Sequence, residues 1–210
     1  MIELFGSAQV TFLLIIDPPG CAPIFASLTR GATAAHRRAM ALRSTMIAWG
    51  ILMFFALLGR PMLHALGISL ASFRIAGGIM LFMIALDMVF ERRTERREKR
   101  AEEIEGTPDA DDISVFPMAI PMITGPGSIA SAMLWVSRAE GAAEVLVVLA
   151  AITVVIVITL LTLLAAGPLM RLIGERMEAM ITRILGVILA ALAAQFVVDG
   201  LKQSFPSVLA

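Results

Sequence analysis

One carboxylate stands inside a hydrophobic run that is long enough to cross a lipid bilayer. The run extends from Val10 to about Leu28, and Asp17 lies near its centre. Proline lacks a backbone N–H and clashes with the preceding turn, so a continuous helix cannot pass through the prolines that follow Asp17. Because Asp17 is a good N-cap and Pro18 a good first-turn residue, a second half-helix is expected to begin there. The candidate binding residues of this first interrupted segment are Asp17, Pro18, Pro19, Gly20 and Cys21.

A second hydrophobic run, which begins at about Val115, carries a similar interruption. Thr124 is the expected N-cap of the half-helix that follows. Irregular backbone at membrane depth is tolerated only inside protein or beside a water-filled cavity, so both interruptions indicate a functional site. The candidates of this second interrupted segment are Thr124, Gly125, Pro126, Gly127 and Ser128.

Two half-helix N-termini near the middle of the membrane would form an anion site. Each presents unpaired N–H groups and a partial positive charge of about half an electron, which suits a carboxylate. Glycines allow a ligand to approach the backbone closely. Asp17 would accept a proton or pair with a ligand ammonium. The alternative for Asp17, and likewise for Thr124, is that the side chain only caps its half-helix.

Three further polar residues are weaker candidates. Gln195 lies within a hydrophobic run and needs a polar partner, which is either the ligand or another helix. Arg74 and Arg183 are possible ligand contacts, with anchoring at the membrane interface as the alternative, because both lie near the ends of hydrophobic runs.

The two interruptions belong to an internal repeat. Thr124 follows Asp17 by 107 positions, and Pro168 follows Pro61 by the same number. Arg183 follows Arg74 by 109 positions. These nearly equal offsets predict two related halves, each opened by a broken helix.

The composition excludes a soluble domain. Hydrophobic residues make up 59% of the chain, and the mean hydropathy is +0.88, which predicts an all-α polytopic membrane protein. Cys21 is the single cysteine, and His36 and His64 lack a second ligand at useful spacing, so we expect no metal site and no cofactor. The six expected spans cover about residues 5–28, 41–58, 71–90, 115–136, 145–166 and 181–201.

Basic residues predict the topology. Thirteen of the 17 lysines and arginines fall after spans one, three and five, which places those loops inside and both termini outside a plasma (bacterial inner) membrane. The expected units are a first three-helix repeat (1–90), a charged cytoplasmic linker (91–113) and a second repeat (114–210). Three spans per half is an odd number, so the second repeat is inverted.

Packing expectations follow from residue type. Gly77, Gly78 and Gly186 are expected to permit close helix packing. Trp49 lies mid-span and is expected in the core, whereas Trp135 is expected to anchor at the interface.

Four stretches resemble signatures of the MarC family of integral membrane proteins. They are residues 12–25, 117–130, 73–79 and 182–186, supported by Gln195 and Gly200. The resemblance implies six helices with a paired broken-helix site at Asp17–Gly20 and Thr124–Gly127, and some relatives are described as transporters of small neutral amino acids such as glycine and alanine. The chain departs from the family at Cys21, where Asn is common, and at Pro19, where an aliphatic residue is common.

We therefore expect a secondary transporter of small neutral amino acids, coupled to protons, that works by alternating access around a midplane site. The alternatives are an exporter of another small metabolite, a membrane-embedded enzyme or a passive channel. The chain has no nucleotide-binding loop, and no nucleophile–base pair stands beside Asp17. The expected partners are the neutral amino acid, protons and the lipid bilayer, without nucleic acid; the sequence leaves the oligomeric state open.

Overall fold

A computed structural model of the chain describes residues 1–92, 95, 96, 99 and 112–205, and this part is helical without strands. Most of the charged linker, including the helical extension expected there, lies outside the described residues. The helices are α1 (Ile2–Ile16), α2 (Pro18–Leu28), α3 (Ala34–Ala65), α4 (Leu70–Val89), η2 (Ser114–Ile123), α6 (Pro126–Arg138), α7 (Ala142–Leu164) and α8 (Ala166–Ser204).

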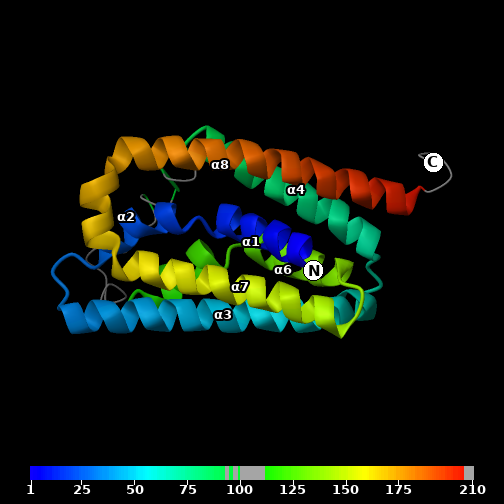
Figure 1. The fold of residues 1–210 in the computed structure, drawn as a ribbon, viewed down its shortest axis with the longest axis horizontal. Coiled ribbons are helices and arrows are strands. Elements are labelled where there is room, and N and C mark those ends of the chain that lie inside the picture. Colours follow the sequence, from blue (N-terminus) through cyan, green and yellow to red (C-terminus); the bar gives the residue numbers. More distant parts are fainter. Residues whose placement is uncertain (93–94, 97–98, 100–111, 206–210) are drawn as a thin grey trace.

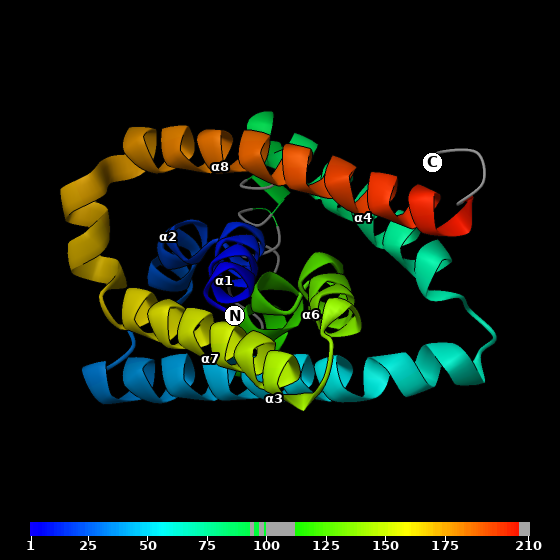
Figure 2. The same cartoon turned by 45° about the vertical axis from the view of Figure 1, so that its right-hand side comes forward.

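The helices form an elongated bundle with α1 and α2 in its centre. Figures 1 and 2 show α3 and α7 on one side of this pair and α4 and α8 on the other. Five helices or helix pairs are long and apolar enough to cross a membrane, and η2 with α6, which meet at 56°, make a sixth candidate. The expected all-α membrane fold is therefore confirmed.

Burial separates the central span from the others. In the most apolar 18-residue window of α1–α2, 67% of residues are buried, compared with 28–33% in the other four unbent spans. Phe12, Ile15 and Ile16 of α1 and Phe25 of α2 are almost completely buried. The span that carries Asp17 is therefore enclosed by protein, and the outer helices provide the surface that lipid would contact.

Helices α4 and α8 pack with their backbones close together, as the glycines predicted. A Cβ atom added to Gly78 would lie 2.9 Å from the carbonyl oxygen of Ala193, and one added to Gly186 would lie 3.1 Å from that of Ala85. Gly77 faces another helix, since its added Cβ would lie 2.9 Å from Cδ1 of Leu134 in α6. These glycines have no side chain, so the helices approach to distances that any larger residue would prevent.

Three expectations about these elements are wrong. Helix α3 continues through Pro61 to Ala65, whereas the second span was expected to end near residue 58. The first part of the fourth span, η2, is irregular, with extended backbone at Phe116 and Ile120, each followed by a proline that donates no hydrogen bond. The two tryptophans have the opposite burial to the one expected, since Trp135 is 4% exposed and Trp49 is 43% exposed.

Candidate functional site

Asp17 joins two helices and caps the second. Helix α1 ends at Ile16, and Asp17 has a left-handed backbone (φ 56°) whose N–H donates to the carbonyl of Leu13 at 3.0 Å. Its carboxylate Oδ1 accepts the N–H of Gly20 at 3.2 Å, and the residue is 1% exposed. The N-cap role is therefore confirmed, and it belongs to a carboxylate that is enclosed in the centre of the bundle.

The expectation of unpaired N–H groups at the start of α2 is wrong. Pro18 and Pro19 have no N–H to offer. The N–H of Gly20 is bound by the Asp17 side chain, and the N–H of Cys21 donates to the Asp17 carbonyl at 3.1 Å. The two prolines and the cap together leave no free backbone donor in this first turn for a second anion.

The second interrupted segment differs at its cap. Helix α6 begins at Pro126 with Gly125 as N-cap, so the prediction of Thr124 as cap is wrong. The Thr124 hydroxyl instead donates to the carbonyl of Ala119 at 2.6 Å. Among the described residues, the N–H of Gly127 makes no hydrogen bond, since the first N–H groups of a helix have no carbonyl of the same helix within reach. This end of a helix therefore still has a donor for an anion.

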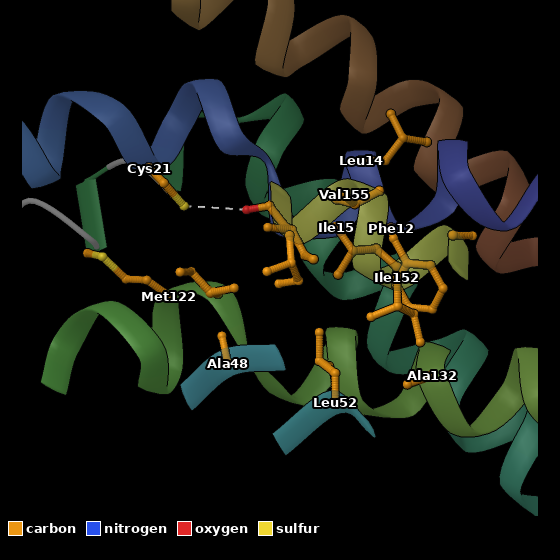
Figure 3. Packing of buried hydrophobic residues seen from close by; sticks show 14 of the residues in the cluster. Phe12, Leu14, Ile15, Cys21, Ala48, Leu52, Met122, Ala132, Ile152 and Val155 are labelled. Atoms are coloured by element: carbon orange, nitrogen blue, oxygen red, sulfur yellow. Dashed lines mark hydrogen bonds between the residues drawn. The ribbon is translucent and has the colours of Figure 1, made fainter. Parts of the chain in front are cut away.

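One hydrogen bond recurs in both interrupted segments. The Cys21 thiol donates to the carbonyl of Ile16 at 3.5 Å (dashed in Figure 3), and the Ser128 hydroxyl donates to the carbonyl of Ile123 at 2.9 Å. Donor and acceptor are offset by the same 107 positions in the two cases. In each segment, a side chain in the first turn of the new helix binds the last carbonyl of the preceding helical segment. A break in a helix removes the donor that the next turn of the same helix would supply to such a carbonyl, so both bonds offset part of the cost of the break.

The two interrupted segments meet in the core. A Cβ atom added to Gly127 would lie 3.5 Å from Cγ2 of Ile15, which precedes Asp17 by two residues. It would also lie 2.5 Å from Cδ1 of Ile84 and 3.3 Å from Cδ2 of Leu81, both in α4. The space beside Gly127 that was expected to receive a ligand is therefore filled by apolar side chains. A ligand that approached Gly127 from this side would have to displace the side chains of Ile84 and Leu81.

The weaker candidates lie elsewhere. The Gln195 amide donates to Asp199 at 2.7 Å, and Arg74 donates to the side chain of Gln203 at 2.9 Å. Arg183 forms an ion pair with Glu91 at 2.5 Å. These contacts lie within α8 for Gln195, between α4 and α8 for Arg74, and between α8 and the chain just after α4 for Arg183, and none of them involves an interrupted segment.

A polar contact between α6 and α8 was missed by the sequence analysis. Arg138 forms an ion pair with Asp199, and its guanidinium carbon lies 4.4 Å from the ring centroid of Phe196 and 5.5 Å from that of Trp135. The only signal in the sequence was one charged residue near the end of each of two apolar runs, which is not enough to predict a pair.

Comparison with known proteins places the chain in a family of integral membrane proteins. The family model described as "MarC family integral membrane protein" matches residues 2–205. The chain is 36% identical to a "UPF0056 membrane protein" of Archaeoglobus fulgidus (98% of this chain, 96% of the relative). It is 36% identical to the "UPF0056 membrane protein MJ1677" of Methanocaldococcus jannaschii (96% and 97%). It is 31% identical to the "UPF0056 inner membrane protein YhgN" of Escherichia coli (93% and 95%). No solved structure matches the chain.

Proposed function

The chain belongs to the MarC family of integral membrane proteins, and from this premise we propose that it is a secondary transporter of small neutral amino acids such as glycine and alanine. The family resemblance motivates the substrate class. The observation that carries the proposal is the contact between the two interrupted segments, one of which holds a buried carboxylate. Interrupted helices that meet inside a bundle are typical of transporter binding sites.

The two ends of an amino acid would bind different segments. The N-terminus of α6, with the free N–H of Gly127, would bind the substrate carboxylate. Asp17 would bind the ammonium group or carry a proton, because an ionisable group inside a membrane protein is rarely retained for structure alone. Thr124, Gly125, Pro126 and Ser128 would shape the α6 end, and Pro18, Pro19, Gly20 and Cys21 would hold the Asp17 end. Gln195, Arg74 and Arg183 fall outside the proposed site, because their polar groups contact other partners.

Transport would follow alternating access. The two halves would form inverted repeats with both interruptions near the membrane midplane, and the recurring hydrogen bonds of Cys21 and Ser128 support this relationship. The described contacts favour α4 and α8 as the moving pair, since Leu81 and Ile84 of α4 cover Gly127. The charge pattern supports a bacterial inner membrane with the termini outside.

Counterflow in proteoliposomes tests the proposal. Vesicles loaded with unlabelled glycine or alanine should accumulate labelled substrate transiently, because a carrier exchanges across the membrane through one site. A passive channel would give no transient, and an enzyme would convert the label into another compound. If neither amino acid exchanges but another small metabolite does, the proposed substrate class of small neutral amino acids is wrong, whereas the proposal of secondary transport still holds. An imposed pH gradient that changes uptake would support proton coupling.

A further inference from the structure

A cavity of about 190 Å³ lies at the end of the bundle where α2 ends and α3 begins. It is far larger than the roughly 10–15 Å³ that a single water needs, so it has room for a polyatomic group. Its walls come from four helices. The lining residues are Ala26, Ala34, Arg37, Arg38, Leu163, Leu164, Ala166, Gly167 and Pro168.

The charged side chains that line this cavity are both positive. Arg37 and Arg38 line it, and neither takes part in the ion pairs that the described residues form. Helix α3 begins at Ala34, so its N-terminus with its partial positive charge also borders the cavity. The start of α8 at Ala166 adds little, because α7 ends at Leu164 and the opposite partial charges of the two helix ends largely cancel. Arginine is well suited to binding phosphate oxygens, and a helix N-terminus adds backbone donors. The cavity therefore favours a phosphate-bearing anion.

An apolar strip leads from this cavity toward the middle of the bundle. On α3, Leu42, Met46 and Trp49 follow Arg38 on one helix face, and all three are 43–63% exposed. On α7, the strip consists of Leu164, Leu161 and Val157, which are 45–59% exposed. We call these six residues the α3–α7 strip.

A hydrogen bond fixes the register of the strip. The indole N–H of Trp49 donates to the Thr153 hydroxyl at 3.1 Å, which joins the two helices at the far end of the strip. Eleven positions separate Arg38 from Trp49, and eleven separate Thr153 from Leu164, so the antiparallel helices keep one register from the cavity to this bond. Eleven residues of helix span about 16 Å, which is close to half of the roughly 30 Å hydrocarbon core.

We propose that the cavity binds the phosphate of an anionic phospholipid whose acyl chains lie along the α3–α7 strip. The basic cavity fits a headgroup, and the length of the strip matches one membrane leaflet. Exposed apolar side chains alone would accept any lipid, so the selectivity comes from Arg37 and Arg38. This site is independent of the proposed transport, because none of the residues that line it is among the candidate residues at the two helix breaks.

Native mass spectrometry of the detergent-purified protein tests the site with dioleoyl phosphatidylglycerol and dioleoyl phosphatidylcholine. We expect the anionic lipid to be retained at least about tenfold more tightly. The double variant Arg37→Gln/Arg38→Gln should lose this preference. The matched control Arg30→Gln/Arg92→Gln removes the same charge from exposed positions outside the cavity and should keep it.

A second pair of variants guards against misfolding. Ala34→Glu adds a carboxylate to the cavity at a helix N-terminus, where a negative charge favours the helix, so the protein should fold and yet bind the anionic lipid more weakly. Ala35→Glu makes the same change one residue away, outside the lining, and should bind normally. Equal retention of the two lipids, or retention unchanged in Ala34→Glu, would overturn the proposal. Inorganic phosphate has no acyl chains. If the protein retained it as tightly as the anionic lipid, the assignment of the site to a lipid would also be overturned.

Discussion

Replacement of Asp17 by asparagine separates the structural role of this residue from its chemical one. In the structure, Asp17 caps α2 through Gly20 and adopts a left-handed backbone at φ 56°. Asparagine caps about as well as aspartate and tolerates the left-handed region equally, so Asp17→Asn should fold and insert normally. Asparagine cannot ionise, so it can neither carry a proton nor pair with an ammonium group.

The magnitudes follow from these two roles. Asp17→Ala loses the cap, which costs about 0.5–2 kcal/mol, and a chain of this size then melts about 1–8 °C lower. Asp17→Asn should show no such shift. We expect it to bind its amino acid at least about tenfold more weakly, equivalent to about 1.4 kcal/mol, or to lose accumulation driven by a pH gradient.

The assay combines thermal unfolding in detergent with counterflow in proteoliposomes. Asp17→Asn should keep the wild-type melting temperature while losing exchange or its pH dependence, whereas Asp17→Ala should lose both stability and exchange. Wild-type exchange by Asp17→Asn, with unchanged pH dependence, would show that the carboxylate only caps α2 and would refute the proposed mechanism.

Three further changes test the packing, the recurring hydrogen bond and the topology. Gly78→Val should lower the melting temperature, because its Cβ would lie 2.9 Å from a backbone carbonyl of α8. In the control Gly50→Val on α3, the added Cβ has nothing within 4 Å, so the melting temperature should change little. Equal changes in the two variants would argue against the α4–α8 contact. Ser128→Ala leaves a carbonyl without its donor and should cost about 1–3 kcal/mol in unfolding measurements. In a background without the native cysteine, Leu66→Cys should react with an impermeant thiol reagent added to intact cells and Ala35→Cys should not; the reverse pattern would invert the proposed orientation.

The sequence predicted the elements better than the faces they bury. The two prolines after Asp17 and its capping oxygen were enough to predict the start of α2, because that geometry is local. Thr124 has a capping oxygen as well, but its hydroxyl is also a donor, and the irregular η2 leaves the Ala119 carbonyl within its reach. Whether the Thr124 side chain caps the next helix or donates to Ala119 depends on the path of the backbone, and the residue types do not determine it.

Burial was harder to predict because both environments of a membrane helix are apolar. Trp135 lies three residues from Arg138 at a helix end, a position typical of an interfacial anchor, yet it packs against Phe196 of α8. Trp49 lies mid-span and is nevertheless exposed. In a soluble protein, an alternation of polar and apolar residues would mark the buried face, but lipid-facing positions carry no such mark. The hydrogen-bond partner of Gln195 was also not predicted, since Asp199 lies on the same helix and not on a neighbouring one.

The glycine contact between α4 and α8 has a consequence for how the chain is made. Helix α4 ends at Val89, and the membrane-spanning part of α8 begins at Ala179, about 90 residues later. At synthesis rates of about 5–20 residues per second, the face of α4 that carries Gly78 waits about 5–20 seconds for its partner. A ribosome that stalls between these helices therefore leaves an inserted first half whose α4 surface is open to other helices, and such a product would be a substrate for membrane quality control.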